Sequence, residues 1–164
     1  MTMTLLEPDR DQLEIFVEAL FRHVGQDGWI SMRAFYEDGS NATARTTPAS
    51  LAGGLRFVID AAEDDARRAA NTPRAAVFCP PVCTFNNKDR AGEADLLAGP
   101  VLSVECDQYP QAARTKLESI LGPATLVVRS GGQWPEPTTG EIQDKLHLYW
   151  RRNKPPRAKT ISPS

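Results

Sequence analysis

Apolar and polar residues recur along the chain with a helical period in three places. Over residues 9–24, six apolar side chains follow this spacing behind Asp9, a residue type that caps helix starts. Residues 49–71 show the same period and include the run AAEDDARRAA, which is typical of a helix with one solvated face. Residues 109–121 repeat the pattern and end at a Gly-Pro pair. We therefore expect three amphipathic helices.

Five shorter apolar stretches have the composition and spacing of β-strands. They are WISMRAFYE, AAVFC before two prolines, GPVLSVECD, ATLVVRSGG and KLHLYWRR. Polar loops are expected at EDGSNATARTTPAS and NNKDRAGEAD, and a wide turn at QWPEPTTGEIQ. This mixture predicts an α+β fold, with a mixed or antiparallel sheet and packed helices. We expect one domain over residues 1–152 and a flexible C-terminal tail over 153–164.

Composition narrows the classes of function. The chain has 164 residues, 41% of them hydrophobic and 24% charged, which suits a globular domain able to bury a core. Its net charge of −2 gives no global positive field, so any basic surface for nucleic acid must be local. No apolar run approaches the roughly 20 residues of a membrane span, and no signal segment opens the chain. We expect a soluble, cytoplasmic protein.

Three cysteines, Cys79, Cys83 and Cys106, are an odd number and are poorly spaced for zinc. The first two enclose two prolines, and no second closely spaced pair follows, whereas zinc sites normally use tighter pairs. We therefore expect three buried free thiols in a reducing compartment and not a zinc site.

An acidic pair ends one of the predicted strands. Glu105 and Asp107 are separated by one residue in VLSVECD, so both side chains lie on one face of that strand. Two adjacent carboxylates repel unless a positive charge lies between them, and a divalent cation with oxygen ligands is a common solution. The pair predicts an Mg²⁺ or Mn²⁺ site, with a plain solvated strand edge as the alternative.

The order of the motifs VECDQYP, VVRSGG and KLHLYW, after the segment FCPPVCTFNNKDRAGEADLLAGP, resembles a known family. It is similar to the RepB-like DNA primase domain, of plasmid and phage type, within the archaeo-eukaryotic primase superfamily, over about residues 77–152. The resemblance implies an RRM-like core and a nucleotidyltransferase that uses two metal ions to synthesise primers on single-stranded DNA. It also implies nucleoside triphosphates, a single-stranded template and either a downstream helicase or the rest of the primase as partners.

Carried over to this chain, the resemblance makes Glu105 and Asp107 metal ligands and His147 a contact to nucleotide phosphates. Glu105 departs from the family's aspartate by one methylene. A histidine with a purely structural role in the sheet is the alternative for His147. The residues that the resemblance assigns to nucleotide or DNA binding are Arg129, Ser130, Gly131, Gly132, Lys145 and Arg151. The glycines would let the backbone approach the substrate, and the lysine and arginines would supply local positive charge.

The superfamily also has a third acidic residue on a strand well downstream of the histidine. Residues 151–164 contain no Asp or Glu, so we expect a truncated primase domain that binds metal and nucleotide but makes little primer. Two alternatives stay open. One is a catalytically dead nucleic-acid-binding module of the same fold, and the other is a small metal-dependent nuclease.

Overall fold

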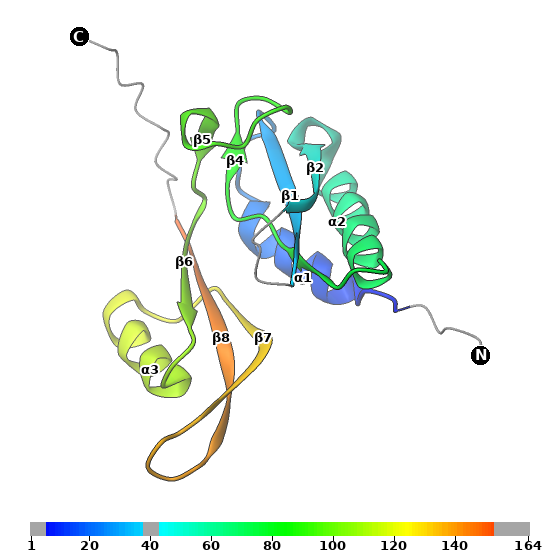
Figure 1. The fold of residues 1–164 in the computed structure, drawn as a ribbon. Coiled ribbons are helices and arrows are strands. Elements are labelled where there is room, and N and C mark those ends of the chain that lie inside the picture. Colours follow the sequence, from blue (N-terminus) through cyan, green and yellow to red (C-terminus); the bar gives the residue numbers. More distant parts are fainter. Residues whose placement is uncertain (1–5, 38–42, 153–164) are drawn as a thin grey trace. The chain divides into compact units, whose positions relative to one another are not determined.

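The computed structural model describes residues 6–37 and 43–152 and confirms the predicted α+β fold, with antiparallel sheets. The tail expected over 153–164 lies outside the described residues. The chain forms two compact units, a first unit that extends to Pro100 and a second unit that begins at Val101 (Figure 1). Both units contribute to the span 1–152 that the sequence predicts as one domain. No helix within the two described ranges is long and apolar enough to cross a membrane.

The first unit combines helices with a five-stranded antiparallel sheet. Its elements are α1 (Arg10–Phe21), β1 (Trp29–Tyr36), β2 (Thr43–Ser50), η1 (Leu51–Gly53), α2 (Gly54–Ala70), β3 (Ala76–Cys79), β4 (Thr84–Phe85), η2 (Glu93–Asp95) and β5 (Leu96–Ala98). The strand order is β2-β1-β4-β5, and β3 also pairs with β1. The Asp9 side chain accepts a hydrogen bond from the Gln12 N–H, as a helix N-cap does, which confirms the predicted start of α1.

Apolar side chains of α1, α2 and β1 form the core of the first unit. Leu20 and Phe21 of α1, Ile30 and Met32 of β1 and Val58 of α2 are all fully buried. Alternate residues of β1 are buried, which is the two-residue period of a strand with one face on the core. The helical and strand periods of the sequence therefore both identify core residues correctly.

The prediction of a loop over EDGSNATARTTPAS is wrong in its second half, where Thr43–Ser50 form β2. Here Ala49 lies opposite Ile30 and Thr47 lies opposite Met32 in the ladder with β1. Three threonines favour a strand because they are β-branched, and Pro48 is tolerated because β2 is an edge strand. Pairing with β1 therefore overrides the polar character of the segment.

The second unit is a three-stranded antiparallel sheet with one helix. Its elements are β6 (Val101–Cys106), α3 (Pro110–Leu121), β7 (Leu126–Pro135) and β8 (Ile142–Arg151), with strand order β6-β8-β7. In Figure 1 the β7–β8 hairpin extends past the end of β6, in agreement with the ladder, which continues to Pro135 opposite Ile142. Because β8 pairs with both β6 and β7, its register decides which residues of these two strands lie side by side with its own.

One face of this sheet packs against α3. Leu146, Leu148 and Trp150 of β8 form a buried cluster with Cys106, and apolar residues of α3 pack on it. The Trp150 indole N–H donates to the Gly122 carbonyl at 2.8 Å, which ties β8 to the end of α3. Odd-numbered residues of β8 consequently lie on the opposite face, called here the site face.

The prediction of three buried thiols holds for Cys106 and is wrong for Cys79. Cys106 is buried and Cys83 is partly buried, whereas Cys79 is exposed. Exposure alternates along the short strand β3, and the side chain of Cys79 is on the exposed face. Burial raises the pKa of the Cys83 and Cys106 thiols, and the nearby Asp107 charge raises that of Cys106 further.

Candidate functional site

Two acidic and two basic residues meet on the site face. Glu105 of β6 lies directly opposite His147 of β8, and its Oε1 is 3.9 Å from His147 Nε2. Asp107 follows the end of β6, and its Oδ1 is 3.5 Å from Lys145 Nζ. The antiparallel register thus brings together residues about 40 positions apart in sequence, as paired strands do for side chains on one face. These four residues are called here the charged group.

The charged group is electrostatically mixed. Each carboxylate has a basic side chain within 4 Å, and the Lys145 ammonium offsets part of the repulsion that the acid pair alone would have. The carboxylates are 68% exposed at Glu105 and 58% exposed at Asp107. Exposed pairs of this kind contribute about 0–1 kcal/mol, so a charged ligand can rearrange them at low cost.

The SGG segment lies beside Lys145. The register of β7 with β8 shifts between Arg129 and Gln133, and Gly131 takes φ +85° within this irregularity. A Cβ at Gly132 would lie 2.8 Å from Lys145 Cδ, so the glycine lets the lysine stem lie close against the backbone. At Gly132 the backbone therefore lies close to the Lys145 side chain. That this backbone also approaches a substrate stays a prediction.

Ser130 belongs to the same segment and is exposed. Its hydroxyl donates to the Lys145 carbonyl over a long 3.4 Å, which is a weak hydrogen bond. The three predicted residues Ser130, Gly131 and Gly132 thus adjoin the charged group through Lys145.

The two predicted arginines lie apart from the charged group. Arg129 is opposite Leu146 and therefore on the α3 face, where its Nε is 3.4 Å from Asp144 Oδ2 and its side chain is 80% exposed. Arg151 lies on the site face but at the other end of β8, opposite Val101. It is four residues from His147, or about 13 Å along a strand. The assignment of both arginines to nucleotide or DNA binding stays a prediction.

Two aromatic residues that the sequence did not single out lie next to the charged group. The ring centroids of Tyr109 and Trp134 are 4.4 Å apart, with the planes inclined by 53°. Trp134 is opposite Gln143 on the site face, and Tyr109 comes two residues after Asp107. Tyr109 has φ +47° and is the only non-glycine residue with positive φ within the described ranges. Their contact depends on the hairpin register, which no local sequence signal reveals.

The acid pair fits a hard cation through its donor atoms. Mg²⁺ is commonly held by one or two carboxylates, with waters and substrate phosphates completing its coordination, and carboxylate oxygens also suit Mn²⁺. Among the residues that the structure describes, no group of three or more His, Cys, Asp or Glu is placed to hold a metal ion. An ion held by Glu105 and Asp107 would need further ligands from a substrate or from solvent.

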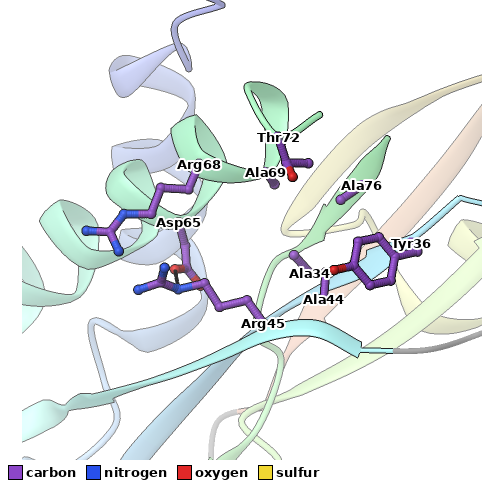
Figure 2. A pocket seen from close by; sticks show the side chains of 9 residues that line it. All are labelled: Ala34, Tyr36, Ala44, Arg45, Asp65, Arg68, Ala69, Thr72 and Ala76. Carbon is purple, nitrogen blue, oxygen red and sulfur yellow. Dashed lines mark ion pairs between the residues drawn. The ribbon is translucent and has the colours of Figure 1, made fainter. Parts of the chain in front are cut away.

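A separate pocket of about 180 Å³ lies in the first unit, between α2 and the strands β1, β2 and β3 (Figure 2). Asp65, only 2% exposed, accepts a hydrogen bond from Thr47 Oγ1 at 2.7 Å and pairs with Arg45 Nε at 2.9 Å. Figure 2 shows the Arg45 and Asp65 side chains facing each other. None of the predicted site residues lines this pocket, and we interpret its polar contacts as a link between β2 and α2.

Comparison with known proteins does not assign the chain to a family. No protein-family model matches the sequence, and no curated protein or solved structure matches it either. The functional proposal is therefore supported by the charged group and by the order of the motifs that form it.

Proposed function

We propose that the second unit carries the metal and nucleotide site of a primase-like nucleotidyltransferase domain from a plasmid or phage, acting in the cytoplasm. The observation that supports this most directly is the register that sets Glu105 opposite His147, with Asp107 and Lys145 adjacent. Along the chain, the acid pair is followed by α3, then by the SGG irregularity in β7, and then by β8 with Lys145 and His147. The primase motifs have the same order.

Each part of the charged group has a distinct task in this proposal. Glu105 and Asp107 would hold Mg²⁺ or Mn²⁺, which supplies positive charge for the phosphoryl oxygens when bound. Lys145 would contact phosphate as a point charge, and its stem is held along Gly132. His147 would donate a hydrogen bond to a phosphate oxygen and so stabilise the departing pyrophosphate. The chain forms no covalent bond to substrate in this scheme.

The mixed charge of the group favours a metal–nucleotide complex over a free metal ion. A free divalent ion must approach Asp107 beside the Lys145 ammonium, which repels it. A nucleoside triphosphate brings the metal for the carboxylates and phosphates for Lys145 and His147, so both signs of charge find partners. We therefore expect the metal–nucleotide complex to bind more tightly than either component.

Nucleotide binding tests this proposal most directly. We expect titration with a non-hydrolysable nucleoside triphosphate and Mn²⁺ to show binding that His147→Ala weakens by about 5- to 150-fold, the range for one charge-assisted contact of about 1–3 kcal/mol. His23→Ala is the matched control, because His23 is the other histidine and lies in the first unit. Equal affinity of the wild type and His147→Ala would return His147 to a structural role.

Assays of primer synthesis, DNA hydrolysis and DNA binding on single-stranded DNA together separate the proposal from its alternatives. With labelled nucleotides and Mn²⁺, we expect little or no primer, because two carboxylates position the reacting oxygens less firmly than three. Hydrolysis of the DNA with metal but without nucleotides would instead favour a nuclease. DNA binding that requires neither metal nor nucleotide would favour an inactive nucleic-acid-binding module.

A further inference from the structure

We infer that Tyr109 and Trp134 form a stacking surface for the base of the nucleotide bound at the charged group. This inference rests on the proposed function and adds a second contact region to it. The two rings are 4.4 Å apart, and Tyr109 is 51% exposed. Trp134 is partly exposed. Stacking on aromatic side chains beside a charged site is a usual means by which proteins hold bases without reading their sequence.

The position of the aromatic pair matches the layout of a nucleotide. Tyr109 is two residues beyond Asp107, and Trp134 is opposite Gln143, two residues from Lys145. Along β8, Gln143 is one side-chain repeat, about 7 Å, from Lys145, so Trp134 lies close to that member of the charged group. Tyr109 lies in the turn between β6 and α3 and reaches the same place through its contact with Trp134. A nucleotide separates its phosphates from its base by a single sugar, so phosphates at Lys145 place the base within reach of the rings.

The geometry of the pair leaves ring surface available. The planes are inclined by 53°, so neither ring covers the whole face of the other. A large aromatic side chain usually buries most of its area, whereas half of the Tyr109 surface is exposed. Tyr109 also has φ +47°, a conformation that costs about 1–2 kcal/mol for a non-glycine residue and is enriched at binding sites.

Stacking on an aromatic ring depends little on the identity of the base, because every base has a π-face. The loss of one such contact lowers affinity by about 5- to 150-fold. The inference therefore predicts similar losses for purine and pyrimidine nucleotides. A ligand that carries the phosphates and lacks the base should not respond to the change.

The test compares a nucleoside triphosphate with inorganic tripolyphosphate, both with Mn²⁺, on the full chain. We expect Trp134→Ala to weaken binding of ATP and CTP by about 5- to 150-fold and to leave tripolyphosphate binding unchanged. Trp134→Phe keeps an aromatic face and should retain most of the nucleotide affinity. Phe57→Ala is the control for loss of an aromatic ring elsewhere, because Phe57 is exposed and lies in the first unit.

A second variant, Tyr109→Asn, removes the other ring with a residue that tolerates positive φ. It should also weaken nucleotide binding selectively. The wild type is expected to bind nucleotide and tripolyphosphate. If Trp134→Ala and Tyr109→Asn bind both ligands as tightly as the wild type does, the stacking inference alone is wrong. An equal loss of both ligands in Trp134→Ala would overturn it too, since that result marks a structural role of the hairpin. A wild type that binds neither ligand would instead refute the proposed function.

Discussion

Glu105 and His147 occupy directly opposed positions of β6 and β8, with Glu105 Oε1 3.9 Å from His147 Nε2. Asp107 and Lys145 form the neighbouring pair at 3.5 Å. Each predicted metal ligand therefore has a basic neighbour, which the segment VLSVECD alone does not reveal. The proposed ligand, a metal–nucleotide complex, likewise carries both signs of charge.

The first prediction concerns the metal. Mn²⁺ should raise the melting temperature slightly, and a saturating Mn²⁺–nucleotide complex at 100 times its Kd should raise it by about 5–10 °C, because both bind only the folded state. Glu105→Gln combined with Asp107→Asn should abolish both shifts. Asp27→Asn combined with Glu141→Gln removes the same charge from exposed positions elsewhere and should retain them. A full shift in the Glu105/Asp107 variant would exclude the acid pair as the metal site.

The second prediction concerns thiol reactivity. Since the thiolate is the reactive form, the exposed Cys79 should be alkylated first and the buried Cys106 last in the native protein. The raised pKa of Cys83 and Cys106 further slows both at neutral pH. Peptide mapping of a labelling time course by mass spectrometry measures the order, and labelling in denaturant should bring the three rates together. Native labelling of Cys106 as fast as Cys79 would contradict the burial of β6 against α3.

The third prediction concerns the stability of the first unit. Asp65→Ala should lower the free energy of unfolding by about 1–3 kcal/mol, because Thr47 and Arg45 lose a buried hydrogen-bond acceptor. Asp64→Ala is the control on the preceding residue of α2, where an exposed pair with Arg68 contributes about 0–1 kcal/mol. Urea unfolding curves of both variants give the comparison. Equal losses would show that the buried network contributes no more than a surface ion pair.

The fourth prediction concerns the pH dependence of the second unit. The Ala124 N–H donates to the Glu118 carboxylate at 3.1 Å and lowers its pKa below the ordinary value of 4.5, and Arg114 contributes in the same direction. A carboxyl group whose pKa is lowered by folding stabilises the protein above its unfolded pKa, and this contribution disappears as the pH falls through its folded pKa. Glu118→Gln should therefore melt below the wild type at pH 7, with a smaller difference at pH 3.

Melting curves at the two pH values measure that difference, and Glu141→Gln on the β7–β8 turn is the control for loss of one exposed charge. A difference between wild type and Glu118→Gln that stays constant from pH 7 to pH 3 would show that the charge of Glu118 does not stabilise the fold.

Much of the fold could be predicted from local patterns. The helical period identified α1, α2 and α3, and the Asp9 cap located the start of α1 within one residue. In KLHLYW, apolar and polar residues alternate, and the structure buries Leu146 and Leu148 while Lys145 and His147 lie on the other face. The polar strand β2 was missed because its stability comes from pairing with β1 and not from its own apolar content.

By itself, the sequence determined which residues share a face within one element, because side-chain direction follows from the backbone period of a helix or strand. It thus placed Glu105 with Asp107 and Lys145 with His147. Only the tertiary structure decided that these two pairs meet, that Arg129 lies on the α3 face, and that Trp134 contacts Tyr109. These relationships depend on strand register, which is fixed by the packing of β8 against α3 and by the irregularity in β7, and both involve residues distant in the chain.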